Sequence, residues 1–432
     1  MKNIRKIFFW VMVICCSKNH YAYAMDPNSG PSLLALSRDR IVSDILKSDG
    51  PVARLRELQS RLPGDLIQEI EAKLSDTLSL LLKQYYELSQ TIKADRYVES
   101  VCISNDNELI ITGGGDSCVN VWRLNGERYE YFQTLPGHFF KKGVAKIGSV
   151  LISSDKNLII TGSIDDDSVN IWKFNGSEYT YFQRLACNSL VLSVAISQDQ
   201  KLIIVGCDDH ALKFWHFDGN GYNKVRTFYD RHLYPKNLKF SSDKEVFIFC
   251  STLIYTPSIY VWKMDRIGLT DLELRGITHR IELSEMLEIP HYALAAAITS
   301  EDRFLHAASL SEDKYIVVVA SEELNVLQFN STNCSYSLLQ KLSSNSWAEF
   351  VKISYDKSLI MAGGLNAKTN IWKFVNGEYI KIQELDPESG VSSGELSVDG
   401  AVIALPCCNG RLNIWKKISL EKLLEIYTLK RC

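Results

Sequence analysis

The sequence has neither an excess of one charge sign nor a long hydrophobic run. Its 432 residues include 48 Lys and Arg against 51 Asp and Glu, a formal net charge of −3. Such a chain lacks the basic surface that nucleic-acid phosphates require, so we expect no nucleic-acid partner. The longest apolar run near the N-terminus has about ten residues, whereas a helical membrane span needs about twenty. We therefore expect no membrane span.

The residues and motifs of cofactor and metal sites are also scarce. The 24 Gly and 10 Pro form no linker-like tract, and no G-x-x-x-x-G-K-[ST] loop occurs. Gly113-Gly114-Gly115 lies where a hairpin turn is expected, so it does not indicate a nucleotide site. None of the 11 Cys forms a C-x-x-C pair, and no His stands at zinc-ligand spacing. We expect no cofactor and no metal.

Residues 1–24 have the pattern of a secretory signal peptide. A basic start, a short apolar run and an A-x-A motif that ends at Ala24 follow one another, with cleavage expected before Met25. The alternative is a buried N-terminal helix. The signal peptide predicts an exported protein, periplasmic or secreted, and leaves open delivery into a host cell. The remaining Cys are scattered, which favours buried thiols, although an oxidising compartment allows a disulfide.

Residues 25–83 have helical periodicity. Apolar residues recur three to four positions apart in three stretches, which Gly50-Pro51 and Pro63 separate. We expect a short α-helical arm. The Leu-Pro-x-Asp pattern from Leu62 to Ile70 faintly resembles the opening of an F-box, a module that docks a ubiquitin-ligase adaptor. An ordinary helix start, with Pro near the first turn, explains the same residues.

From residue 84 to residue 432 the chain repeats. A Ser-x-Asp turn opens each unit and Asn-Gly pairs occur in several, as in antiparallel hairpins. The pattern predicts an all-β fold of four short antiparallel strands per unit, with seven units stacked radially. An apolar tripeptide closed by Trp marks six units and ends at Trp122, Trp172, Trp215, Trp262, Trp372 and Trp415. In one further copy, Leu327 stands in place of the Trp.

These units resemble the WD-repeat family of β-propellers. Thr112 to Trp122 matches the family's strand, Asp turn and Trp, and Gly137-His138 matches its Gly-His dipeptide. The resemblance implies a seven-bladed β-propeller with structural roles for the six repeat Trp residues and for the turn residues Asp116 and Asp209. The turn Asp becomes Asn in later units, so we expect the family's internal hydrogen-bond network to be incomplete in most blades.

The start and the tail of the repeat region predict how the ring of units closes. Residues 86–104 align without gaps with residues 179–197, which predicts an outer strand at about 86–93 that completes the last blade. The tail after Trp415 is then a capping helix or an extra strand. In the alternative, the tail itself forms the last outer strand.

The long interval between Trp262 and Leu327 predicts an insertion at about residues 265–302.

No catalytic constellation stands out, so we expect a protein that is not an enzyme. The turn carboxylates recur in all units and are therefore architectural, and the acidic run 165–167 predicts a solvated loop, with a cation site as the alternative. Loops on the family's top face carry aromatic and basic residues, which are typical interface anchors. These candidate partner-binding residues are His138, Phe139, Phe140, Lys141, Arg231, His232, Tyr234 and Trp347.

The resemblance implies a protein-interaction module. We expect an exported, monomeric scaffold whose propeller loops bind a protein or peptide partner. The alternative is an F-box-like substrate receptor for ubiquitin ligation that is delivered to a host cell.

Overall fold

The computed structural model describes most of the chain with a number of gaps. The described residues are 32–48, 50–60, 62, 64–82, 85–94, 97–136, 138–140, 143–144, 146–231, 233–240, 246–251, 258–263, 307–311, 316–320, 323–330, 335–343, 348–365 and 367–431. The predicted signal peptide, the predicted insertion, Lys141, His232 and Trp347 lie outside the described residues.

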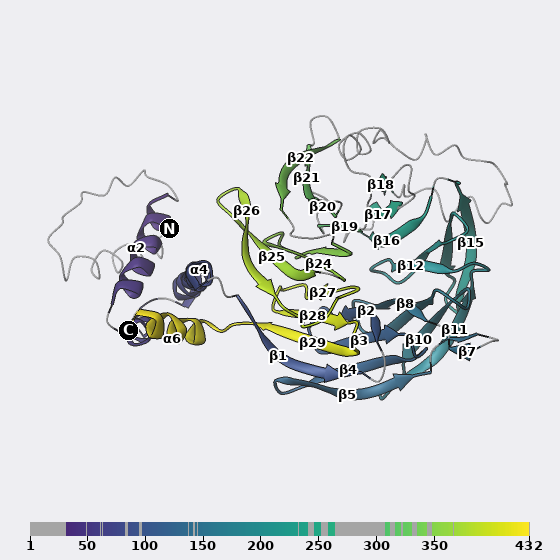
Figure 1. Ribbon diagram of the computed structural model, residues 1–432, viewed down its shortest axis with the longest axis horizontal. Helices are drawn as coiled ribbons and strands as arrows, with labels where there is room; N and C mark the ends of the chain where they lie inside the picture. Colours follow the sequence, from purple (N-terminus) through teal and green to yellow (C-terminus); the bar gives the residue numbers. More distant parts are fainter. Residues whose placement is uncertain are drawn as a thin grey trace. The chain divides into compact units, whose positions relative to one another are not determined.

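The chain divides into two compact units, Met1–Tyr85 with Ile418–Cys432, and Tyr86–Lys417. The first unit is helical and contains α2 (Ser32–Lys47), α3 (Pro51–Gln59), α4 (Gly64–Leu82) and α6 (Leu420–Arg431). The tail after Trp415 is thus a helix and not an extra strand, and Figure 1 labels it α6. Apolar side chains three to four positions apart on α4 meet those of the other helices in one core, which includes Ile45, Leu55, Ile70, Leu74, Leu78 and Leu424.

The second unit consists of antiparallel sheets that follow one another along the chain (Figure 1). The first sheet contains β2 (Val98–Ile103), β3 (Leu109–Gly114), β4 (Val119–Asn125) and β5 (Arg128–Leu135). The second contains β8 (Ile147–Ile152), β9 (Leu158–Ser163), β10 (Ser168–Phe174) and β11 (Tyr179–Ala186). The third contains β12 (Val191–Ile196), β13 (Leu202–Cys207), β14 (Ala211–Phe217) and β15 (Tyr222–Tyr229).

The later sheets repeat this arrangement. The fourth has three strands among the described residues, β16 (Pro235–Phe240), β17 (Val246–Ser251) and β18 (Ser258–Lys263). The fifth contains β19 (Ala307–Leu310), β20 (Ile316–Ala320), β21 (Leu324–Asn330) and β22 (Ser335–Leu342). The sixth contains β23 (Phe350–Ile353), β24 (Leu359–Gly364), β25 (Ala367–Val375) and β26 (Glu378–Leu385). The seventh contains β27 (Glu395–Leu396), β28 (Val402–Cys407), β29 (Arg411–Lys417) and β1 (Tyr86–Lys93).

The first strand of each sheet lies innermost, and these strands contact one another in a closed order. β2 contacts β8, and the order continues through β12, β16, β19 and β23 to β27, which contacts β2 again. Seven sheets therefore form the closed ring that the repeat count predicts. A separate two-stranded hairpin, β6 (Phe139–Phe140) and β7 (Gly143–Val144), lies between the first and second sheets in the sequence.

The N-terminal strand closes the ring. β1 pairs antiparallel with β29, with Tyr86 opposite Lys417 and Lys93 opposite Arg411. The outermost strand of the seventh sheet therefore comes from the start of this unit, as the gapless alignment of residues 86–104 predicts. In addition, the Tyr86 hydroxyl donates a hydrogen bond to the Gly400 carbonyl at 2.6 Å.

The Ser-x-Asp turns shape the hairpin between the first two strands of each sheet. In the first sheet, Ser104 Oγ donates to Asp106 Oδ1 at 2.7 Å and accepts from the Leu109 N–H at 2.9 Å. The fourth residue of the turn, Asn107, has φ 61°, a left-handed conformation that Asn adopts readily. The same Ser-to-Asp bond recurs at Ser153, Ser197, Ser354 and Ser397.

A glutamine on the outer strand joins neighbouring sheets. Gln133 Nε2 donates to the Tyr179 carbonyl at 2.8 Å, and Gln133 Oε1 accepts from the Tyr179 N–H at 2.9 Å. The Tyr179 hydroxyl then donates to the Lys156 carbonyl in the Ser-x-Asp turn of its own sheet, at 2.7 Å. We call this arrangement the Gln–Tyr clamp; it recurs with the pairs Gln90–Tyr129, Gln183–Tyr222, Gln340–Tyr379 and Gln383–Tyr86.

Candidate protein-interaction face

The three predicted partner-binding residues whose side chains the structure describes lie on one face of the ring. Because the strands of a sheet alternate in direction, the crossover from an outer strand to the next inner strand lies on the same face as the loop between the second and third strands. We call this side the crossover face. It carries His138, Arg231 and Tyr234.

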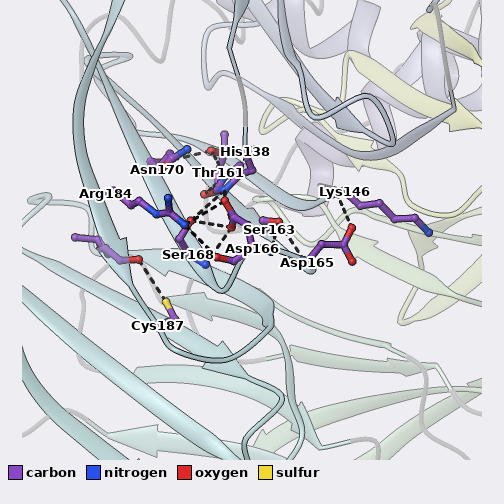
Figure 2. A network of polar contacts seen from close by, with 11 residues as sticks. His138, Lys146, Thr161, Ser163, Asp165, Asp166, Ser168, Asn170, Arg184 and Cys187 are labelled. Atoms are coloured by element: carbon purple, nitrogen blue, oxygen red, sulfur yellow. Dashed lines mark hydrogen bonds and ion pairs between the residues drawn. The ribbon is translucent and has the colours of Figure 1, made fainter. Parts of the chain in front are cut away.

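His138 forms the centre of a buried polar network on this face. Its side chain is 0% exposed. Nδ1 lies 2.9 Å from Asp166 Oδ2, and Nε2 lies 3.0 Å from Thr161 Oγ1. Ser168 Oγ donates to Asp166 Oδ1 at 2.7 Å, and Figure 2 shows these side chains converging on His138. All these partners belong to the second sheet, so the network fixes the preceding crossover to that sheet.

The network favours the ionised form of the Asp166 carboxyl group. Burial opposes its ionisation, but hydrogen bonds from His138 and Ser168 and the charge of Arg184 hold its pKa below the usual value. Arg184 Nη2 lies 3.5 Å from Asp166 Oδ2 at the edge of the network. The carboxylate is thus retained as an internal anion with its hydrogen bonds satisfied.

Two predictions are wrong at this place. His138 cannot contact a partner from a fully buried position, because its ring nitrogens are engaged within the second sheet. The acidic run 165–167 is not simply a solvated loop, since Asp166 is buried against His138. This loop has one residue more than its equivalent in the first unit, which hides the match between Asp166 and the turn residue Asp116 in an ungapped comparison.

The described repeat Trp side chains lie between sheets. Trp172, Trp215 and Trp372 are buried and contact the preceding sheet, while Trp122 and Trp415 are half-buried. Trp122 Nε1 donates to Thr112 Oγ1 at 3.1 Å, whereas the buried indole N–H groups of Trp172 and Trp415 have no hydrogen-bond partner among the described residues. The side chain of Trp262 lies outside the described residues.

The two predicted turn carboxylates differ from each other. Asp116 Oδ1 accepts from the Cys118 N–H at 3.0 Å and so stabilises its own turn. Asp209 Oδ2 instead lies 2.6 Å from Lys213 Nζ, a buried ammonium that has no counterpart in the second sheet.

Tyr97 is an exposed aromatic at the entry to the first sheet. It is 37% exposed, and Lys146 Nζ lies 5.7 Å from its ring centroid. The Tyr97 hydroxyl and the Glu99 carboxylate raise the pKa of Lys146. A Cβ at Gly115 would lie 2.6 Å from Tyr97 Cε1, so only Gly leaves room for the ring there. The ring is therefore held in one position while its outer surface meets solvent.

Tyr234 is fixed in a comparable way at the entry to the fourth sheet. Its hydroxyl donates to the Asp208 carboxylate, and burial followed by the charge of Asp208 raises its pKa. Lys236 Nζ lies 5.3 Å from the ring centroid. The Asp208 N–H donates to the carbonyl of Leu190, whose side chain is partly exposed beside this group. Tyr234 is half-buried, and Arg231 on the same crossover is exposed.

Some exposed residues of this face carry no sequence pattern that would predict their exposure. Tyr97, Leu190 and Leu365 are exposed apolar side chains in polar loops. Each is a single apolar residue next to a strand, which periodicity assigns to the strand rather than to a surface. Phe139 and Phe140 form strand β6, and their side chains lie outside the described residues.

The described residues offer little for metal chemistry or membrane insertion. Over the described part of the chain, no three His, Cys, Asp or Glu side chains gather as metal ligands would. Among its described helices, none combines the length and apolar character that crossing a membrane requires.

Comparison with known families assigns the repeats. A family model described as WD domain, G-beta repeat, matches residues 86–123, 129–173 and 180–216. Three repeats of the chain match the WD-repeat family. The first matched segment runs from β1 to β4, so one repeat joins the outer strand of the seventh sheet to the inner strands of the first. No curated protein matches this chain. The repeats support a protein-interaction module, in a family that is generally not catalytic.

Proposed function

We propose that this protein is an exported, non-catalytic interaction module that binds a peptide or protein partner on its crossover face. The observation that carries the proposal is the pair of partly exposed aromatic rings, Tyr97 beside Lys146 and Tyr234 beside Lys236 and Asp208. Aromatic side chains that are immobilised before binding lose little entropy when a partner covers them.

The surroundings of the two rings indicate what kind of partner fits. Leu190 and Leu365 add apolar surface on the same face, while Lys146 and Arg231 are exposed cations. Apolar anchors within a polar rim are the usual anatomy of a protein–protein interface. A partner segment with apolar side chains and some acidic groups would complement this face.

Substitution on the two faces tests the proposal. Tyr97→Ala combined with Tyr234→Ala removes both rings, and we expect the partner's Kd to rise at least 30-fold, since one anchor contributes about 2 kcal/mol. Tyr355→Ala is the control, because Tyr355 is 56% exposed in a Ser-x-Asp turn on the opposite face. Partners are cross-linked to the full chain in its producing cells. The amount of partner recovered is then compared among wild type, the double variant and the control. Equal recovery with the double variant and the control would contradict the assignment of the face.

Export is a separate part of the proposal and has its own measurement. The basic start, apolar run and A-x-A motif of residues 1–24 support it. We expect the intact mass and N-terminal residue of the protein outside the cytoplasm to correspond to a chain that begins at Met25. A chain that keeps Met1 and stays in the cytosol would rule out export.

The alternative function, a substrate receptor for a ubiquitin ligase, would need Leu66 and Ile70 to contact the ligase. Leu66 and Ile70 are buried in the core of the helical unit. Side chains that fill their own unit's core are not available to an adaptor unless that core opens. We therefore do not retain the F-box-like segment as a binding site.

A further inference from the structure

One cysteine of the third sheet and one of the crossover that leads into it lie in the same hydrophobic core. Cys187 follows the end of β11, and Cys207 is the last residue of β13. They are 1% and 0% exposed, and both belong to the core between the second and third sheets. Their side chains interact with each other, and both are free thiols in the structure. Residues 20 positions apart in the sequence thus meet in one core.

A buried lysine holds the loop that carries Cys187. Lys213 Nζ donates to the Cys187 carbonyl at 2.7 Å and to Asp209 Oδ2 at 2.6 Å. Lys213 itself is 1% exposed. The equivalent position in five other units is an asparagine: Asn120, Asn170, Asn325, Asn370 and Asn413. The third sheet therefore departs from these five units at the residue that fixes this loop.

The seventh sheet shows the same geometry without the second thiol. There Cys407 occupies the position of Cys207, and Asn413 Nδ2 donates to the Pro387 carbonyl at 3.1 Å. Cys407 Sγ lies 3.7 Å from that carbonyl oxygen. Pro387 thus stands where Cys187 stands in the third sheet. The fold brings this loop over this strand end in both sheets, and only in the third does it bring two thiols together there.

We propose that Cys187 and Cys207 form a disulfide when the chain folds in an oxidising compartment. The proposed bridge ties the crossover that carries Leu190 to strand β13, so it fixes part of the crossover face. The presence of such a compartment rests on the export in the proposed function. The oxidant is a small-molecule disulfide of the glutathione class.

The chemistry balances as two thiol–disulfide exchanges. The Cys207 thiolate attacks one sulfur of the oxidant, and a mixed disulfide forms while one small thiolate leaves. The Cys187 thiolate then attacks the Cys207 sulfur, and the second small thiolate leaves. Two electrons pass from the cysteines to the oxidant, and the two cysteine protons end on its two thiols.

In the folded core, the charges around the pair favour the thiolate of Cys207 over that of Cys187. The hydrogen bond from Cys187 lowers the pKa of Cys207 against the effect of burial, and the charge of Lys213 acts in the same direction. The hydrogen bond with Cys207, followed by burial, raises the pKa of Cys187. Because the folded core covers both sulfur atoms, the bridge forms as the chain folds and is then protected from reductants.

Refolding under defined redox conditions tests the pair directly. The full chain from Met25 to Cys432 is reduced, unfolded, refolded in a mixture of reduced and oxidised glutathione, and alkylated. We expect peptide mapping to find Cys187 linked to Cys207, with a loss of about 2 Da from two hydrogens, and Cys407 alkylated. Cys187 and Cys207 both alkylated in folded protein, or linked to other cysteines, would overturn the inference.

Variants separate the bridge from a general effect of losing a thiol. Cys187→Ser and Cys207→Ser should each leave the other cysteine alkylated, whereas Cys407→Ser should keep the bridge. The urea midpoint of wild type should fall on addition of reductant, and that of the Cys187→Ser variant should not change. A midpoint that responds equally in both proteins would contradict the bridge.

The same mapping on protein from its natural compartment distinguishes this inference from the proposed function. A bridge in both refolded and isolated protein supports the site and the export together. A bridge in refolded protein, with reduced thiols and Met1 in the isolated chain, keeps the pair and removes the export. No bridge on refolding removes the inference, whether or not the chain is exported.

Discussion

At the residue scale, the second sheet depends on a carboxylate that the sequence places in an acidic run. Asp166 is buried and accepts hydrogen bonds from His138 and Ser168. The buried anion is tolerated because these two side chains donate to it and Arg184 brings a positive charge close to it. The neighbouring Asp165 has a different role, since its Oδ2 accepts the Lys146 N–H at 2.7 Å on the crossover face.

Asp166→Asn should destabilise the ring unit by about 1–3 kcal/mol near neutral pH, because an amide replaces the anion that the network is built to hold. The measurement is the urea midpoint of wild type and variant. Asp116→Asn is the matched control at the equivalent turn of the first sheet, where one backbone N–H is the partner, and it should cost about 1 kcal/mol or less.

The pH dependence of that difference follows from the pKa of Asp166, which is lower in the folded protein than in the unfolded chain. The folded state therefore favours the ionised form, and the resulting stability is fully present above the unfolded pKa of about 4. It is lost as the pH falls through the folded pKa. The gap between wild type and Asp166→Asn should shrink below about pH 4. A constant gap down to the acid transition would contradict this account.

At the scale of elements, the sheets are joined by the Gln–Tyr clamp as well as by apolar packing. One Gln side chain satisfies both backbone groups of a Tyr at the exposed edge of the next outer strand. The Tyr hydroxyl then binds the left-handed residue of its own Ser-x-Asp turn, such as Lys156 with φ 62°. An outer strand that carries such a Tyr is thereby fixed to the sheet before it and to the hairpin of its own sheet.

Gln133→Ala should lower the free energy of unfolding by about 1–3 kcal/mol, because it leaves two backbone groups of Tyr179 without their partner. Gln133→Glu should cost as much, since a carboxylate cannot donate to the Tyr179 carbonyl. Glu178→Ala, an exposed change beside Tyr179, is the control and should stay within about 0.5 kcal/mol of wild type. Equal denaturation midpoints for all four proteins would show that the clamp contributes nothing.

At the scale of the whole ring unit, closure depends on a strand from the opposite end of the unit. β1 completes the seventh sheet, and Tyr86 joins it to Gly400 and to Gln383 of the sixth sheet. The seventh sheet thus contains residues about 320 positions apart in sequence, and its formation needs both ends of the ring unit.

Tyr86→Ala should therefore destabilise the ring unit by about 3–5 kcal/mol, because it removes a fully buried aromatic at the closure. Tyr86→Phe, which loses only the hydroxyl bond to Gly400, should cost about 1 kcal/mol. Limited proteolysis with fragment mapping measures the local effect. We expect early cleavage within residues 86–93 in Tyr86→Ala and not in Tyr86→Phe. Cleavage that begins elsewhere in the ring would argue against β1 as the closing element.

The sequence by itself determined the repeat, the number of sheets and the strand that closes the ring. Those features depend on local chemistry: Ser and Asp side chains that bond their own turns, apolar strands, and a Trp at a fixed place in most units. Each signal occurs several times, so a single degenerate unit does not hide it. The helical arm followed from apolar spacing in the same way.

Only the tertiary structure decided which distant loop residues meet. His138 and Asp166, and likewise Cys187 and Cys207, lie 28 and 20 positions apart, and no local pattern marks them as pairs. The exposure of Tyr97 and Leu365 depends on how the neighbouring loops pack. Gly115, for example, leaves room for the Tyr97 ring. Contacts between loops of different sheets depend on loop length to the residue, and the extra residue that hid Asp166 shows why periodicity alone does not give them.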